Sequence, residues 1–158
     1  MKVVGAKGIG ASWGMAVSGS AEFDVDASPE QVMDAVAAVE DLPQRSPSHK
    51  SAEVETRHED GRPDRVRAKV SAAGFSDEEV TDYSWDGLRS VTWTLAESSV
   101  QSTQVGTYTL TPTDAGTHMR LDLEIGVKVP MPGFVLKRVL KGALDTGSRG
   151  FKEYVESR

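Results

Sequence analysis

The sequence predicts an α+β fold in which a strongly curved antiparallel sheet of seven strands wraps around one long C-terminal helix. Three observations predict this class. Segments of alternating polar and apolar residues follow one another from residue 50 to 129, separated by short turns. Apolar residues then recur at spacings of three and four from 133 to 157. A single strand and two short helices precede both regions, and a chain of 158 residues fits one domain.

The first strand and helix are marked by their own residue patterns. Residues 17–26 alternate between apolar and polar side chains, which is typical of a half-buried strand. Ser28, Pro29 and Gln31 then predict a helix start, because serine caps, proline suits the first turn and Gln31 completes a capping box. Pro43 ends this helical region, and the polar stretch to residue 48 predicts one further helical turn.

Six consecutive antiparallel strands are predicted next, and Asp86-Gly87 between two of them is a strong signal for a two-residue hairpin turn. Residues 117–129 show the longest alternation. There Met119, Leu121, Leu123 and Ile125 are expected to face inward, and His118, Arg120, Asp122 and Glu124 outward.

Pro130 and Pro132 end the last strand, because proline cannot donate a hydrogen bond to a neighbouring strand. The amphipathic pattern that follows predicts one helix over residues 133–157. Gly142, Gly147 and Gly150 each weaken a helix by up to about 1 kcal/mol relative to alanine, so close packing or a ligand near the backbone is expected there.

Charge and composition exclude several classes of function. The glycine-rich residues 1–14 are expected to form a flexible arm before a single domain over 15–158, and no stretch fits a secretory signal, which favours a cytoplasmic protein. The net charge of −6 divides into +2 for the arm, −11 for residues 15–132 and +3 for 133–158, and so acidic a body excludes nucleic acid as a partner. The chain has no cysteine and its three histidines have no ligand spacing, so neither a metal nor a cofactor is expected.

The alternation of inward and outward side chains along each strand, here called strand parity, also indicates whether the interior holds catalytic groups. Trp93 and Tyr108 are expected to face inward and to supply the interior's polar groups, an indole N–H and a phenol, with no inward carboxylate, histidine or arginine. Acid–base catalysis needs such a group in position, so parity favours binding over catalysis. The acidic residues Asp77, Glu78, Glu79 and Asp82 are expected to form an outer face paired with Arg65, Arg67 and Lys69, and His49 is expected near a cavity entrance.

The chain resembles the helix-grip fold of the START/Bet v 1 (SRPBCC) superfamily, and in particular its bacterial polyketide cyclase/dehydrase and lipid-transport branch, over residues 16–157. The resemblance is carried by Ala27-Ser28-Pro29-Glu30-Gln31-Val32-Met33, Ser46-Pro47-Ser48-His49-Lys50-Ser51, Val91-Thr92-Trp93-Thr94-Leu95, Gly106-Thr107-Tyr108-Thr109-Leu110-Thr111-Pro112 and Val129-Pro130-Met131-Pro132-Gly133-Phe134. Relatives often carry an aromatic residue where this chain has Arg45. The resemblance implies a hydrophobic cavity between the sheet and the long helix, in which members bind lipids, sterols, polyketides or small aromatic compounds.

These observations predict a protein that binds a hydrophobic small molecule or lipid in an internal cavity. The residues expected to line the cavity are Phe23, Met33, Val36, Val70, Trp93, Tyr108, Leu110, Met119, Leu121, Leu123, Leu136, Val139, Leu140 and Ala143. Two alternatives stay open: an aromatase/cyclase-type enzyme acting on a polyketide, with Tyr108 as proton donor, and a component of a protein complex. The basic residues Lys137, Arg138 and Lys141 beside the apolar segment 129–134 also suggest transient contact with an anionic membrane. The oligomeric state is left open.

Overall fold

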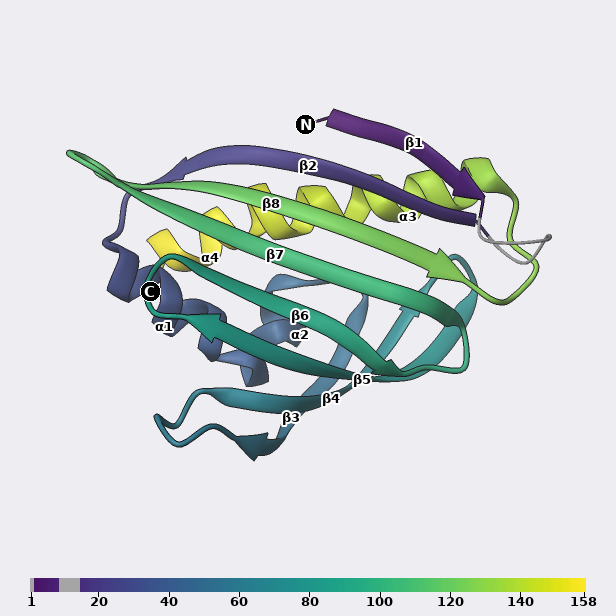
Figure 1. The fold of residues 1–158 in the computed structure, drawn as a ribbon, viewed down its shortest axis with the longest axis horizontal. Helices are drawn as coiled ribbons and strands as arrows, with labels where there is room; N and C mark the ends of the chain where they lie inside the picture. The colour runs from purple at the N-terminus through teal and green to yellow at the C-terminus, as the bar shows by residue number, and fades with distance from the viewer. Residues whose placement is uncertain (1, 9–14) are drawn as a thin grey trace.

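A computed structural model describes residues 2–8 and 15–158 of the chain, in which one curved sheet packs against a C-terminal helix (Figure 1). The strands are β1 (Lys2–Gly8), β2 (Met15–Val25), β3 (His49–Arg57), β4 (Pro63–Ala72), β5 (Phe75–Asp86), β6 (Ser90–Glu97), β7 (Gln101–Thr113) and β8 (Gly116–Val127). The helical elements are α1 (Pro29–Ala37), the 3₁₀ turn η1 (Val39–Asp41), α2 (Leu42–Arg45), α3 (Gly133–Asp145), the π-helical turn η2 (Thr146–Gly150) and α4 (Phe151–Glu156).

All seven predicted strands are present and pair antiparallel, which confirms the predicted sheet. Its order is β1-β2-β8-β7-β6-β5-β4-β3, so β2 pairs with the last strand while β3 to β8 follow one another as a meander. Hydrogen bonds between β2 and β8 place the first and last long strands of the domain side by side. The sheet curls around the helix that runs beneath it (Figure 1).

Part of the segment expected to be a flexible arm is a strand. Residues Lys2–Gly8 form β1, which pairs antiparallel with β2 at the edge of the sheet. The physical reason is that an edge strand such as β2 presents unpaired backbone N–H and C=O groups, which a neighbouring extended segment can satisfy. The expectation therefore needs correction for residues 2–8, while residues 1 and 9–14 lie outside the described part of the chain.

The start of α1 follows its sequence signature. The Ser28 side chain accepts a hydrogen bond from the Gln31 N–H at 3.2 Å, and the Gln31 side chain accepts one from the Ser28 N–H at 2.8 Å. This capping box satisfies two N–H groups that have no partner within the helix. The helix then buries Val32, Met33 and Val36 against the core.

The parity predicted for β8 is also present. Met119, Leu121, Leu123 and Ile125 are buried, whereas His118 lies outside and bonds to Asp24 and Glu22 across the pairing with β2. The inward face packs against α3, which buries Leu136, Leu140 and Leu144 at intervals of four residues. The core therefore lies between the concave face of the sheet and the C-terminal helix.

The C-terminal helix is not a single α-helix. Between α3 and α4 the chain makes the π-helical turn η2, which contains Gly147 and Gly150. A Cβ atom at Gly147 would lie 2.6 Å from Leu121 Cδ2 and 3.3 Å from the Tyr108 hydroxyl, so this glycine permits close packing of the helix on β7 and β8. The Tyr108 hydroxyl donates to the Gly147 carbonyl oxygen at 2.7 Å, which gives a carbonyl in this irregular turn a partner.

Candidate functional site

A cavity of about 680 Å³ lies between the concave face of the sheet and the C-terminal helix. Most of its wall is apolar and comes from both layers, with Val66, Ala68 and Val70 from β4 on one side and Val135 and Val139 from α3 on the other. A volume of this size is in the range of natural small-molecule sites, which are mostly apolar with a few placed polar groups.

The residues predicted to line a cavity fall into two groups. On the wall lie Val36, Val70, Trp93, Tyr108, Leu121, Leu123, Leu136, Val139 and Ala143. Phe23, Met33, Leu110, Met119 and Leu140 pack in or against the core instead and do not line this cavity. Parity correctly identifies the inward face, but it does not distinguish an inward side chain that is covered by a helix from one that borders open space.

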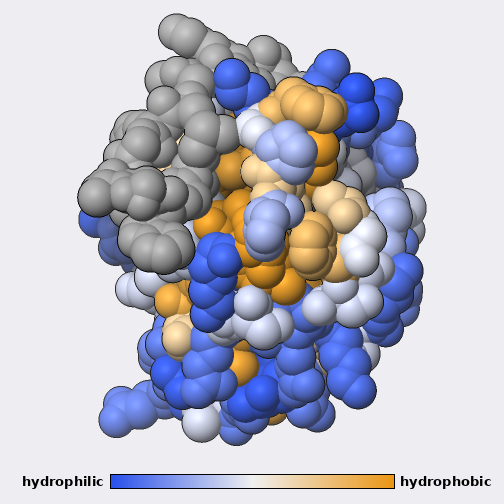
Figure 2. All heavy atoms as spheres, turned by 90° about the vertical axis from the view of Figure 1, so that its right-hand side faces the viewer, coloured by the Kyte–Doolittle hydropathy of each residue, from blue (hydrophilic) through white to orange (hydrophobic). Residues whose placement is uncertain are grey.

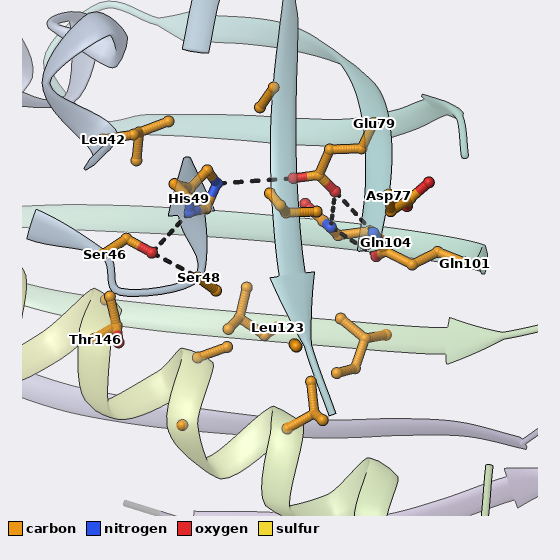
Figure 3. Close-up of a pocket in the computed structure, with 18 of the residues that line it drawn as sticks. Leu42, Ser46, Ser48, His49, Asp77, Glu79, Gln101, Gln104, Leu123 and Thr146 are labelled. Atoms are coloured by element: carbon orange, nitrogen blue, oxygen red, sulfur yellow. Dashed lines mark hydrogen bonds and ion pairs between the residues drawn. The ribbon is translucent and has the colours of Figure 1, made fainter. Parts of the chain in front are cut away.

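The cavity has a polar end that sequence parity missed (Figure 3). Glu79 on β5 is only 6% exposed, and its Oε2 accepts hydrogen bonds from Gln101 Nε2 at 2.7 Å and from Gln104 Nε2 at 2.9 Å. All three side chains line the cavity. Burial raises the pKa of Glu79, although the two glutamine hydrogen bonds act in the opposite direction.

His49, at the start of β3, faces Glu79 across this end of the cavity (Figure 3). Its Nδ1 is 2.7 Å from Ser46 Oγ, and its Nε2 is 3.7 Å from Glu79 Oε1. Burial lowers the pKa of His49 to about 4, and the charge of Arg45 acts in the same direction. Because the imidazole is then neutral near pH 7, its approach to Glu79 is not an ion pair at that pH.

The acidic residues of β5 are divided between two faces, which corrects the expectation of one outer face. Arg65 bonds to Asp82 and Arg67 to Glu78 on the outer surface, as predicted. Asp77 and Glu79 point to the cavity instead, because they alternate with Glu78 along the strand.

The carboxylate of Asp77 is engaged in hydrogen bonds within the protein. It accepts hydrogen bonds from the hydroxyls of Ser98 and Ser99 and from the Ser99 N–H, which fixes the turn between β6 and β7. Burial alone would raise the pKa of Asp77, but these hydrogen bonds outweigh it and hold the pKa below its usual value. Its role is therefore to shape the wall near Glu79.

Two tyrosines line the cavity with different hydrogen bonding. The Tyr108 hydroxyl, the proton donor considered from sequence, already donates to Gly147, and burial raises its pKa. Burial also raises the pKa of Tyr83 to about 12, but no other group in the described part of the chain is hydrogen-bonded to the Tyr83 hydroxyl. Tyr83 therefore keeps a free donor at the cavity, whereas Tyr108 does not.

The tyrosines belong to a row of aromatic rings along the wall. Tyr83 stacks on Trp93 at a centroid distance of 6.1 Å, Trp93 contacts Tyr108 at 5.4 Å, and Tyr108 stacks on Phe151 at 5.1 Å. All four side chains line the cavity. The wall thus offers flat aromatic faces to a bound molecule.

Arg45, at the position that departs from the family pattern, also lines the cavity. It is neither fully solvated nor free: its Nη1 donates to the Ala35 carbonyl at 2.8 Å, and its guanidinium lies over the rings of Tyr154 and Phe151, 4.6 and 5.4 Å from their centroids. These contacts fix the guanidinium near His49. The expectation of an interior without carboxylate, histidine or arginine is therefore wrong.

One end of the molecule carries an apolar hollow, at the end where β8 finishes and α3 begins (Figure 2). The cavity reaches this end, because Val100, Met131 and Val135 belong to its wall. Phe134, in the first turn of α3, is 64% exposed, and Arg138 lies over its ring at 5.6 Å from the centroid. Hydrophilic side chains gather below the hollow in this view (Figure 2).

Within residues 2–8 and 15–158, no helix has the length and hydropathy needed to cross a membrane. No group of three or more His, Cys, Asp or Glu side chains in the same residues is arranged to hold a metal ion.

Comparison with known proteins agrees with this architecture. Residues 16–156 match the model of the family described as polyketide cyclase/dehydrase and lipid transport. A START superfamily protein from Mycobacterium smegmatis is 26% identical, with a TM-score of 0.77, over 90% of this chain and 97% of that one. No curated protein is similar enough in sequence to match the chain.

Two more distant structures share the fold. The Zhui aromatase/cyclase from Streptomyces sp. R1128 is 16% identical, with a TM-score of 0.75, over 92% of this chain and 95% of that one. A protein from Thermus thermophilus is 23% identical, with a TM-score of 0.68, over 89% and 97% of the two chains.

Proposed function

Because the chain belongs to the polyketide cyclase/dehydrase and lipid transport family, we propose that it binds a hydrophobic small molecule or lipid in the cavity between its sheet and its C-terminal helix. The observation that carries this proposal is the cavity itself, about 680 Å³ in volume and walled mostly by apolar side chains. Binding an apolar ligand there removes its surface from water, which stabilises the complex by roughly 25 cal/mol for each Å² of apolar area buried.

Native mass spectrometry after mild purification tests whether the protein carries such a ligand. A bound molecule that is released by denaturation and extracted into organic solvent would support the proposal. A second test uses Ala143→Phe, which places a ring in the cavity from α3, with Glu153→Phe on the exposed face of α4 as the matched control. Ala143→Phe should abolish binding while Glu153→Phe leaves it intact, and equal binding by both variants would contradict the proposed site.

An aromatase/cyclase-type enzyme acting in the same cavity is the second candidate. The polar end favours it, because the buried Glu79 and the half-buried, neutral His49 could move a proton during ring closure and loss of water. Tyr108 is a poor proton donor here, since its hydroxyl is engaged by Gly147. Among the tyrosines at the cavity, Tyr83 is the better candidate.

The enzyme candidate is tested with a linear poly-β-keto chain as substrate. Product formation with loss of one water, lost in Glu79→Gln and kept in Tyr108→Phe, would support a cyclase that uses the polar end. Binding of the substrate with neither loss of water nor a cyclised isomer, as judged by mass and by chromatographic retention, would leave the protein as a carrier.

Transient contact with an anionic membrane is the route we propose for ligand exchange. The exposed Phe134 lies next to the cavity's apolar end, and Lys137, Arg138 and Lys141 belong to the same helix, with Lys137 and Lys141 exposed. An aromatic side chain flanked by cations suits the interface of a bilayer with acidic lipids.

A further inference from the structure

The polar end of the cavity contains two unused hydrogen-bonding atoms that face each other. Glu79 Oε2 accepts from both glutamines, but no hydrogen bond within the described part of the chain uses Glu79 Oε1. His49 Nε2 lies 3.7 Å from that oxygen, beyond hydrogen-bonding distance, while Nδ1 is engaged by Ser46. Because Glu79 lines the cavity, this oxygen can accept a hydrogen bond from a bound group without any existing hydrogen bond being broken.

The surrounding charges indicate what kind of group fits there. Arg45 lies close enough to lower the pKa of His49, so a second cation at this place would be repelled. Asp77 and Glu79 on the other side would repel an anion. A neutral group that donates a hydrogen bond to Glu79 avoids both repulsions, and a hydroxyl is the simplest such group.

The shape of the wall indicates what carries the hydroxyl. Tyr83, Trp93 and Tyr108 form a continuous row of rings, with centroids 5.4 to 6.1 Å apart, and line the same cavity as Glu79. Aromatic faces pack best against other rings, whereas an alkyl chain needs no such row. A phenol combines a flat ring with a hydroxyl that donates strongly and accepts weakly.

We propose that Glu79 and His49 form a hydroxyl-recognition site for a phenolic, ring-bearing ligand whose hydroxyl donates to Glu79 Oε1 beside the imidazole of His49. This inference rests on the proposed ligand-binding function and names the class of ligand. His49 Nε2 is the second contact, because it lies 3.7 Å from Glu79 Oε1 and therefore next to the same hydroxyl.

The test compares 2-naphthol with 2-methylnaphthalene, which has nearly the same size and lacks the hydroxyl, by isothermal titration calorimetry at pH 8. The native chain should prefer 2-naphthol about tenfold, which corresponds to the gain of one net hydrogen bond of ordinary strength. In Glu79→Gln the amide oxygen can still accept from both glutamines, but an NH₂ group replaces the free acceptor, so the preference should fall to less than about twofold. Binding of 2-methylnaphthalene should stay within about twofold of the native value.

Glu78→Gln is the matched control, because Glu78 is the next residue on the same strand and bonds to Arg67 on the outer surface. It should keep the full preference for 2-naphthol. Equal affinity of the native chain for both probes would overturn the hydroxyl site and leave the proposed apolar binding intact. Failure of both probes to bind would contradict the proposed function together with this inference.

A third probe separates a phenol from a lipid-like alcohol. 1-Decanol carries its hydroxyl on a flexible chain, and the native chain should show no Glu79-dependent gain for it over decane. A gain equal to that of 2-naphthol would overturn the preference for a ring.

Discussion

At the scale of single residues, the two cavity tyrosines differ in what their hydroxyls do. Tyr108 ties β7 to the π-helical turn through its bond to Gly147, whereas Tyr83 has a hydroxyl free of hydrogen bonds within the described residues. The same chemical group therefore stabilises the fold at one position and is available to a ligand at the other. Tyr108 belongs to a motif that carries the family resemblance, but Tyr83 is the tyrosine whose hydroxyl can donate a hydrogen bond to a ligand.

Removing each hydroxyl should separate these roles. Tyr108→Phe leaves the Gly147 carbonyl without its partner in a buried place, so the free energy of unfolding should fall by about 1–3 kcal/mol. Tyr83→Phe breaks no hydrogen bond and should change stability little. Urea unfolding followed by circular dichroism measures both, and an equal loss in the two variants would contradict the assignment.

His49 makes the stability depend on pH. Its pKa is about 4 in the folded protein and about 6.5 when exposed, so between these values the unfolded chain binds more protons. The stability is therefore full above pH 6.5 and should fall by about 3 kcal/mol as the pH drops to 4. His49→Asn should remove that part of the slope in unfolding titrations between pH 7 and 4.5.

His118 is the control for this pH dependence, because its shift has the opposite sign. Hydrogen bonds from its ring to Asp24 and Glu22 raise the pKa of this exposed histidine. Its contribution is present below pH 6.5 and is lost as the pH rises through the folded pKa. A His118→Asn variant should therefore keep the acid-side loss, and loss of that slope in His118→Asn instead of His49→Asn would contradict the prediction.

The polar end shows why sequence reasoning missed part of the site. Alternation along 77–82 places Asp77 and Glu79 on the face opposite Glu78 and Asp82, and this signal was present in the chain. Four acids near three bases favoured a single outer face, because an inward carboxylate is unfavourable without partners. Those partners, Gln101 and Gln104, come from the next but one strand, and no local pattern connects them to Glu79.

At the scale of elements, the C-terminal helix departs from the single α-helix that its apolar spacing predicts. The spacing correctly predicts that Leu140, Leu144, Phe151 and Val155 are buried. The π-helical turn between them depends on tertiary contacts, namely the hydrogen bond from Tyr108 and the contact with Leu121. Periodicity within the helix cannot reveal contacts made by another strand.

The helix glycines provide a matched pair of substitutions. A Cβ at Gly142 would meet nothing within 4 Å, so Gly142→Ala should stabilise the protein by up to about 1 kcal/mol through helix propensity. Gly147→Ala places a Cβ 2.6 Å from Leu121 Cδ2 and should destabilise by about 1–3 kcal/mol. Thermal unfolding of both variants measures the difference, and a stabilising Gly147→Ala would show that the turn does not need a glycine.

Turns and caps were the most predictable elements. A turn forms at Asp86-Gly87 with Gly87 at a φ of +55°, but Asp86 pairs with Ser90, so the turn has three residues instead of the predicted two. The Ser28 capping box is formed as its residues indicate. Both depend on a few neighbouring residues, so local sequence determines them. Strand β1 lay beyond this kind of reasoning, because its glycine-rich sequence carries no alternation and its partner is the edge of β2.

At the scale of the whole molecule, charge and apolar surface are arranged around the end where the cavity reaches the surface. Phe134 is exposed there, and the basic residues Lys137 and Arg138 follow it on α3. The total charge of −6 hides this arrangement, because the body of the chain is acidic and the C-terminal segment is basic. The sequence predicted this division, but the exposure of Phe134 came from the structure.

Membrane contact through this end should depend on Phe134 and on salt. At low salt the native protein should co-sediment with vesicles of phosphatidylcholine and phosphatidylserine, and about 0.5 M salt should release it, since the Debye length falls below about 5 Å. Phe134→Ser should reduce binding several-fold, because the aromatic ring no longer enters the interface. Leu88→Ser, at another exposed apolar residue in the β5–β6 turn, is the control, and no sedimentation of the native chain at low salt would contradict membrane contact.

The position of Trp93 makes its fluorescence a reporter of the cavity. Its indole borders the cavity and contacts Tyr108, whereas Trp85 bonds to the Pro63 carbonyl and does not line the cavity. A molecule that enters the cavity changes the polarity around Trp93 and leaves that around Trp85 unchanged, while the third tryptophan, Trp13, lies outside the described residues. The protein therefore contains an intrinsic fluorophore for cavity occupancy. In a variant with Trp13→Phe and Trp85→Phe, emission from Trp93 can follow ligand entry and release in real time without an added label.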